Sequence, residues 1–111
     1  MNRLLRNMAS NIQKIVDTIV REFKPEKVVL FGSHAWGIPK ENSDIDLLVL
    51  KKDKNKNTRE MSIDLERLLA NRNVPLDILV YKPDQVEKRL RINDPFLTKI
   101  YKEGKLLYEQ K

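Results

Sequence analysis

Segments typical of helices and segments typical of strands alternate along the 111 residues of this chain. Apolar residues recur at helical spacing between Ile12 and Phe23, and Pro25 then ends that pattern. Three short apolar runs are typical of buried strands: residues 28–31, 44–50 and 76–81. This alternation predicts an α/β (α+β) fold in which helices cover a single small mixed β-sheet.

Residues that begin helices recur in the second half of the chain. Asn57, followed by Glu60 three residues later, resembles a capping box ahead of a helical apolar pattern. Pro83 and the Asp-Pro pair at 94–95 are typical first residues of two further helices. Residues 106–108 are predicted to form a last edge strand. The length fits one domain, which we place at residues 1–111.

Composition excludes several kinds of site. The chain has no cysteine and a single histidine, which excludes disulfides, cysteine nucleophiles and zinc sites that need two imidazoles. No apolar run reaches the 18 residues or so that a membrane-spanning helix needs, and the first residues lack a signal-peptide core. We therefore expect a cytoplasmic protein that makes no membrane contact.

The charge is uneven along the sequence. The formal net charge is +6, which is typical of proteins that bind nucleotides or acidic partners and also of lysine-rich surfaces that maintain solubility. Residues 28–50 are instead net negative. The chain has no recognised nucleic-acid motif and no basic stripe rich in aromatic residues, so we do not expect direct binding of nucleic acid.

Three aspartates stand in strands that are otherwise apolar. Asp44 and Asp46 are two residues apart, so in a strand they point to the same face with Cα atoms ~6.5–7 Å apart. Asp77 is a third charge in such a run. Carboxylates this close repel each other unless a cation neutralises them, and Mg²⁺ prefers oxygen ligands. Three of them could hold two metal ions around a phosphate, whereas taken singly each is also compatible with an ion pair or a turn cap.

A glycine-serine pair follows the first predicted strand. Gly32 allows the backbone to approach an anion closely, and Ser33 at the start of a helical turn adds a hydroxyl donor beside free N–H groups. Gly37 is expected to end that turn. The chain has neither a Walker loop nor a Rossmann glycine pattern.

Together, residues 32–37 (GSHAWG) and 43–49 (SDIDLLV) resemble the signature of the DNA polymerase beta-like nucleotidyltransferase superfamily. The resemblance is to its minimal branch, the MNT domains, including the antitoxin type, and it spans about residues 12–108. The family's third carboxylate lies on a later strand, where this chain has Asp77. The fold implied is that of the polymerase beta-like nucleotidyltransferases.

The resemblance also implies an enzyme and a division of roles. ATP would donate AMP, with Gly32 and Ser33 binding its β- and γ-phosphates. Asp44 and Asp46 would bind two Mg²⁺ ions, and Asp77 would bind one of these ions and activate the acceptor hydroxyl. The base of the nucleotide is not fixed by these residues.

The acceptor and partner are implied only by the resemblance. MNT-type proteins are typically paired with a small helical HEPN-type toxin, and as antitoxins they adenylylate a tyrosine of that partner. Two alternatives stay open: a small-molecule acceptor such as an aminoglycoside, and a non-catalytic module that neutralises a ribonuclease by contact. The apolar helix faces are equally compatible with packing on the chain's own sheet or with a homo-oligomer.

Two neighbouring residues have no role assigned by the pattern. Trp36 stands where the family often has a basic residue, and we expect it to pack in the core rather than to stack on a ligand. His34 is expected to face solvent beside the turn rather than to take part in catalysis.

Overall fold

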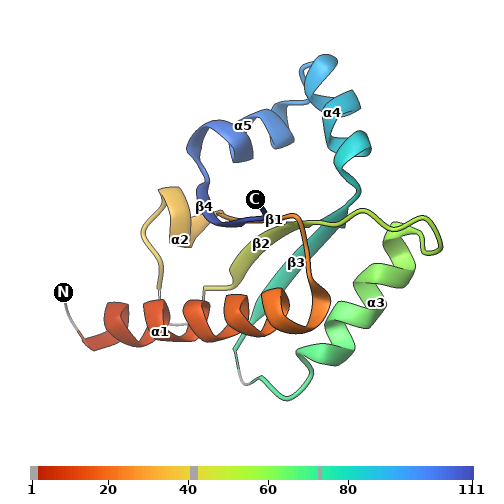
Figure 1. Ribbon diagram of the computed structural model, residues 1–111. Coiled ribbons are helices and arrows are strands. Elements are labelled where there is room, and N and C mark those ends of the chain that lie inside the picture. The colour runs from red at the N-terminus through yellow and green to blue at the C-terminus, as the bar shows by residue number, and fades with distance from the viewer. Residues whose placement is uncertain (1–2, 41–42, 73) are drawn as a thin grey trace.

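One four-stranded β-sheet organises the chain (Figure 1). The structure is a computed structural model, and it describes residues 3–40, 43–72 and 74–111. The strand order is β3-β2-β1-β4, with β1 antiparallel to β2 and β4, and β2 parallel to β3. The strands are β1 (Lys27–Phe31), β2 (Ile45–Leu50), β3 (Leu76–Tyr81) and β4 (Lys105–Glu109). The predicted mixed sheet is confirmed, and so is the last strand at its edge.

Helices cover both faces of this sheet. Figure 1 shows α1 and α3 on one face and α4 and α5 on the other, with the short α2 beside one end of the sheet. The helices are α1 (Arg3–Thr18), α2 (Ser33–Trp36), α3 (Thr58–Leu68), α4 (Pro83–Arg91) and α5 (Pro95–Glu103). Within the described ranges, none of these helices is long and apolar enough to cross a membrane.

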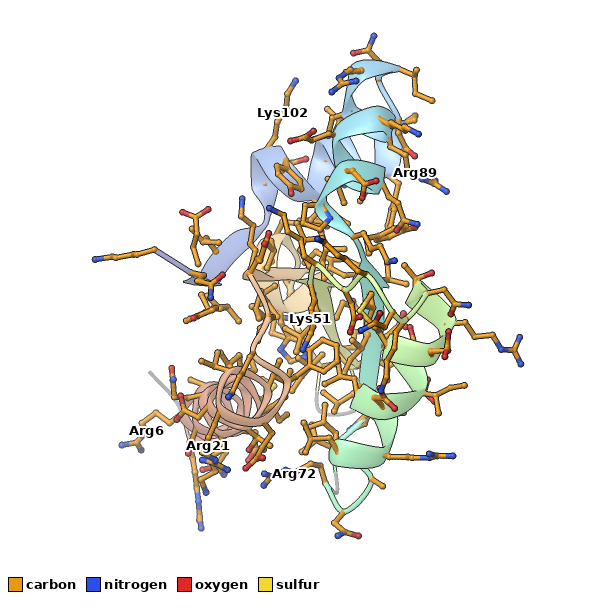
Figure 2. All side chains as sticks on the ribbon, turned by 45° about the vertical axis from the view of Figure 1, so that its right-hand side comes forward. Arg6, Arg21, Lys51, Arg72, Arg89 and Lys102 are labelled. Atoms are coloured by element: carbon orange, nitrogen blue, oxygen red, sulfur yellow. The ribbon has the colours of Figure 1, made fainter. Side chains whose placement is uncertain are left out.

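The first helix ends in a widened turn before Pro25. A π-helical turn (Ile19–Phe23) continues α1, and Lys24 then adopts a left-handed conformation with φ 54°. The ammonium of Lys51 donates a hydrogen bond to the carbonyl oxygen of Phe23 and lies 4.5 Å from the centre of its ring (Figure 2). A cation at this position satisfies a carbonyl that the end of a helix leaves without a partner.

The helix starts predicted from capping residues are confirmed. The Asn57 side chain accepts a hydrogen bond from the Glu60 amide at 2.8 Å, and the Glu60 side chain accepts one from the Asn57 amide at 3.2 Å. Asp94 accepts hydrogen bonds from the amides of Phe96 at 2.9 Å and Leu97 at 3.2 Å. This second cap fixes where α5 begins, and α5 borders the candidate site described below.

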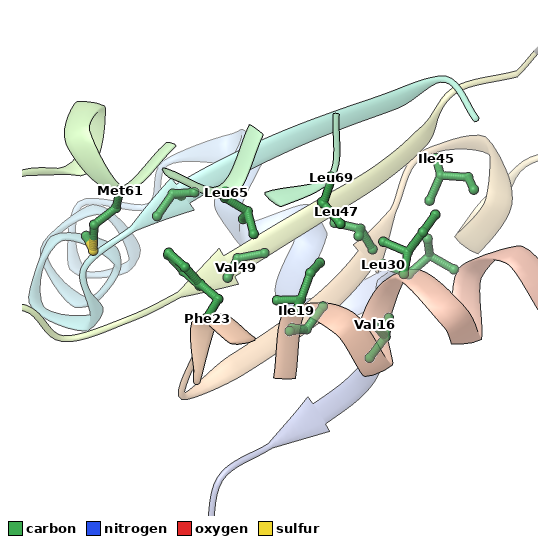
Figure 3. Close-up of a cluster of buried hydrophobic side chains, with 13 residues drawn as sticks. Val16, Ile19, Phe23, Leu30, Ile45, Leu47, Val49, Met61, Leu65 and Leu69 are labelled. Carbon is green, nitrogen blue, oxygen red and sulfur yellow. The ribbon is translucent and has the colours of Figure 1, made fainter. Parts of the chain in front are cut away.

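The central strand β2 is buried on both sides. Ile45, Leu47 and Val49 belong to the apolar cluster between the sheet and helices α1 and α3 (Figure 3). Leu48 and Leu50 belong to the opposite cluster, under α4 and α5. Successive side chains of a strand alternate between faces, so the same alternation assigns Asp46 to the face that carries α4 and α5.

Candidate active site

A row of three side chains crosses the sheet at one end. Phe31 on β1 is the cross-strand neighbour of Asp46 on β2, and Asp46 is in turn level with Asp77 on β3. Level residues on neighbouring strands have Cα atoms roughly 4.5–5.5 Å apart, and their side chains share a face. Asp44 lies just before β2 begins at Ile45. The structure therefore brings together the three carboxylates that the sequence singled out.

The electrostatics of Asp46 reflect this crowding. Partial burial raises the pKa of the Asp46 carboxyl above its usual value, and the negative charges of Asp77 and then Asp44 raise it further. His34 acts in the opposite direction and lowers the Asp46 pKa. Asp44 and Asp77 are exposed, whereas Asp46 is half-buried. The site thus concentrates negative charge around one carboxylate that is partly removed from water.

Gly32 lies directly against this carboxylate. Its φ of 75° and ψ of −154° fall in a region that is essentially open only to glycine. A Cβ atom at this position would lie 2.0 Å from the Asp46 Oδ2 atom, well inside contact distance. Glycine is therefore required here both by the backbone conformation and by the approach of Asp46.

The turn after Gly32 is the four-residue helix α2. The amides of Ala35 and Trp36 donate hydrogen bonds to the Gly32 carbonyl oxygen at 2.9 and 3.0 Å. The Gly37 amide donates a hydrogen bond to the backbone carbonyl oxygen of Ser33 at 3.2 Å. Gly37 therefore ends the turn, as predicted. Ser33 is the first residue of the helix, at the end nearest the carboxylates.

An aromatic cluster joins α2 and α5 to the row of carboxylates. The ring of Phe31 lies 5.6 Å from that of Phe96 in an edge-on arrangement and 6.4 Å from that of Trp36. The ammonium of Lys99 on α5 lies 4.8 Å from the centre of the Trp36 ring. Trp36 packs against the cluster under α4 and α5, in line with the packing role expected from the sequence.

His34 was expected from the sequence to face solvent, but the structure places it partly inside the protein. It is half-buried, and its Nε2 atom lies 3.2 Å from the Ser43 carbonyl oxygen. This contact joins α2 to the residue that precedes Asp44. Sequence reasoning also missed Phe96 and Lys99, which contact Phe31 and Trp36 only because α5 folds back over the sheet. No local pattern around either residue signals this placement.

The carboxylates fit a magnesium ion that shares its coordination with a substrate. In the part of the chain that the structure describes, no three histidine, aspartate or glutamate side chains are grouped closely enough to hold a metal by themselves. Mg²⁺ rarely needs such a cage, because it keeps several waters and is usually bound by one or two carboxylates together with substrate phosphates. Asp44 and Asp46 supply donors of that kind.

A cavity of about 500 Å³ lies at the other end of the sheet, between β1, α4 and α5. Among its lining residues, Lys27 forms an ion pair with Glu109 at 3.1 Å and lies 5.2 Å from the centre of the Tyr101 ring. Lys27 and Phe31 are at opposite ends of β1, so this cavity is separate from the carboxylates. Two other carboxylates of its lining, Glu26 and Glu87, pair with Lys52 and Arg91 outside the cavity, and we assign it no chemistry.

The sequence matches the family described as Polymerase beta, Nucleotidyltransferase over residues 13–111. The chain belongs to this nucleotidyltransferase family. The match includes Gly32, Ser33 and all three aspartates. No curated protein sequence matches the chain significantly.

Solved structures support the nucleotidyltransferase fold. A "putative nucleotidyltransferase" from Sulfolobus solfataricus is similar with a TM-score of 0.68 and 22% identity, over 96% of this chain and 85% of that one. A mutant of the toxin–antitoxin pair MntA–HpeT is similar with a TM-score of 0.53 and 24% identity, over 89% and 73%. A toxin–antitoxin structure with AMP-PNP gives 0.53 and 25%, over 88% and 73%.

The close approach of Gly32 and Asp46 predicts an energetic coupling between the two positions. Gly32→Ala should destabilise the protein by about 1–3 kcal/mol through backbone strain alone. The clash between the new Cβ atom and the Asp46 carboxylate should add to this loss. In an Asp46→Ala background the carboxylate is gone and only the strain remains. Urea unfolding of the four proteins in this double-mutant cycle measures the coupling. Equal losses in both backgrounds would contradict the geometry.

The raised pKa of Asp46 predicts that its charge destabilises the ligand-free protein. A carboxyl whose pKa is raised by folding contributes stability below its unfolded pKa, and that stability is lost as pH rises through the folded pKa. Asp46→Asn should therefore raise the melting temperature at pH 7, and the gain should disappear at acidic pH below about 3.8, the unperturbed value. Glu66→Gln, which removes an exposed charge on α3, is the control. A gain that does not depend on pH would contradict this account.

Proposed function

We propose that this chain is a Mg²⁺-dependent nucleotidyltransferase that transfers AMP from ATP to a hydroxyl group of a protein partner. The observation that carries the proposal is the level row of Asp46 and Asp77, with Asp44 beside it, against the turn at Gly32. Family membership supplies the class of reaction. The nucleotide, the metal and the partner are the proposed parts.

Different parts of the site would hold the phosphates of the donor and the metal ions that accompany them. The Gly32–Ser33 turn would hold the β- and γ-phosphates, because the first amides of a helix lack partners within the helix and the serine hydroxyl adds a donor. Asp44 and Asp46 would bind the metal ions, one of which Asp77 shares. When bound, Mg²⁺ supplies charge neutralisation at the phosphate oxygens.

Asp77 is the residue best placed to act on the acceptor. It is exposed on β3, on the opposite side of Asp46 from the glycine turn, where a second molecule can reach it. Its carboxylate would accept the proton of the acceptor hydroxyl, whose oxygen forms a bond to the α-phosphorus. The bond from that phosphorus to the bridging oxygen breaks, and pyrophosphate leaves.

Two of the similar structures support the choice of donor and partner. One holds AMP-PNP, which carries an adenosine and a chain of three phosphorus atoms. The other is a toxin–antitoxin mutant in which two aspartates two positions apart are changed to glutamate, the same spacing as Asp44 and Asp46. These resemblances favour ATP as the donor and a toxin as the acceptor, and the resemblance of the sequence to the MNT domains implies a toxin of the HEPN type.

A labelling reaction tests the proposed transfer. Incubation of the protein with Mg²⁺, ATP labelled at the α-phosphate and the product of the adjacent gene should label that product. The Asp44→Asn, Asp46→Asn double variant should give no label, because it removes both proposed metal-binding carboxylates. The same reaction with labelled GTP, CTP and UTP identifies the base.

Two results would contradict this proposal. Label that persists in the double variant would show that the carboxylates do not carry the reaction. If the protein protects cells from its partner without labelling it, and the triple Asp44, Asp46 and Asp77→Asn variant protects equally well, the protein neutralises its partner by contact.

A separate substitution divides donor binding from chemistry. Asp77→Asn keeps the shape of the side chain but removes the proton acceptor, whose help is typically worth about 10²–10⁴ in rate. Asp44 and Asp46 still hold the donor, so the dissociation constant for Mg–ATP should change by less than about tenfold, or about 1.4 kcal/mol. Titration calorimetry and single-turnover labelling measure the two effects, with Glu66→Gln as control. Normal turnover in Asp77→Asn would remove Asp77 from the catalytic residues.

A further inference from the structure

Lys99 is held over the helix that follows the glycine turn. Its ammonium lies 4.8 Å from the centre of the Trp36 ring, although the two residues belong to α5 and α2 and are far apart in the sequence. An ammonium above the face of an indole is attracted by the negative charge of the ring. Trp36 therefore favours one position for a cation that is carried on a flexible side chain.

The same contacts attach this cation to the carboxylate site. Phe31, the cross-strand neighbour of Asp46, lies against both Trp36 and Phe96, and Phe96 is in the first turn of α5. The Asp94 cap fixes that first turn. Lys99 thus belongs to a helix that is anchored at the row of carboxylates.

Lys99 is also available to a ligand. It is exposed, and among the residues that the structure describes it forms no ion pair. By contrast, Lys27 and Lys56 are each paired with a carboxylate. An ammonium with unused donors, held over Trp36 in the helix that follows the glycine turn, is suited to an anion.

The distance between Ser33 and Trp36 along α2 indicates which part of the nucleotide Lys99 would bind. Trp36 is three residues after Ser33, which is less than one helical turn and about 4.5 Å along the helix axis. Phosphates held at Ser33 would therefore lie close to the side chain that positions Lys99. A lysine ammonium acts on phosphate as a point charge with three donors.

We propose that Lys99 binds the terminal phosphates of the donor nucleoside triphosphate and that Trp36 is the positioning residue for its ammonium. This inference rests on the proposed function, because it needs the β- and γ-phosphates to lie at Gly32 and Ser33. It adds a binding residue from α5, more than sixty residues along the chain from the glycine-serine motif. The positive charge of Lys99 and the Mg²⁺ held by the aspartates would then neutralise different parts of the same triphosphate.

Binding of three probes to matched variants tests this inference. The probes are Mg–ATP, Mg–pyrophosphate and AMP, measured by titration calorimetry and by the fluorescence of Trp36, the single tryptophan in the sequence. Lys99→Met keeps the apolar stem over the ring but removes the charge, and Lys99→Arg restores it. Lys102→Met is the control, because Lys102 is on the same helix and projects away from the molecule (Figure 2).

The expected result is selective. Lys99→Met should bind Mg–ATP and Mg–pyrophosphate about 10- to 100-fold more weakly, as expected for the loss of a charged hydrogen bond, while AMP binding stays within about twofold. Lys99→Arg should recover most of the affinity, and Lys102→Met should match the wild type. Melting temperatures show that each variant is folded.

Three results would overturn the inference, and they can be told apart. If Lys99→Met binds Mg–ATP as tightly as the wild type, Lys99 is not a phosphate-binding residue, and the proposed function stands. If AMP binding falls as much as Mg–ATP binding, Lys99 acts on the shape of the site instead. If the wild type binds neither Mg–ATP nor Mg–pyrophosphate, the proposed function fails and this inference fails with it.

Discussion

The approach of the Asp46 carboxylate to the Cα atom of Gly32 sets the geometry of the whole site. This contact joins the end of β1 to the start of β2. It is possible only because residue 32 is a glycine and has no side chain. Because the chain turns sharply at Gly32, α2 begins beside the carboxylates rather than continuing the strand. The turn thereby lies directly against Asp46, the middle carboxylate of the row that includes Asp77 and lies next to Asp44.

Apolar packing elsewhere in the sheet holds these charges in place. Leu48 and Leu50 are buried under α4 and α5, and Leu47 and Val49 are buried on the opposite face. A slip of one residue in β2 would exchange these faces and would carry Asp46 to the wrong side of the sheet. The register that keeps Asp46 level with Phe31 and Asp77 is therefore enforced by residues that take no part in the chemistry. The stability of this core offsets the repulsion among the three aspartates.

The order of elements could be predicted from the sequence because its signals are local. Helical periodicity, the Asn57 capping box and the Asp94-Pro95 start each act within a few residues, and each appears in the structure. The π-helical turn before Lys24 has no such signal, and the Lys51 ammonium that meets the Phe23 carbonyl at its end comes from far along the chain. Strand order is likewise a property of the packed sheet.

Some residues of the candidate site could likewise be predicted from local sequence motifs, whereas others could not. The spacing of Asp44 and Asp46 and the glycine-serine pair were visible as motifs, and Asp77 stood out as a charge in an apolar strand. The half-buried position of His34 and the aromatic contacts of Phe96 and Trp36 follow from tertiary contacts with Ser43 and Phe31. A sequence pattern identifies residues of unusual chemistry, but not ordinary residues that folding places beside them.

The charge distribution of the chain favours one order of binding for the metal and the nucleotide in the proposed reaction. The net charge of +6 attracts an anionic nucleotide over a long range, whereas the carboxylates at the end of the sheet repel it at short range. These two effects are compatible if a metal enters with the nucleotide, since in the proposed function Mg²⁺ would offset part of the negative charge of both the triphosphate and the aspartates. The raised pKa of Asp46 points in the same direction, because a crowded carboxylate gains most from a cation when the site is filled. In the proposed function, therefore, metal and donor bind as one unit, and Asp77 is the carboxylate left facing the acceptor.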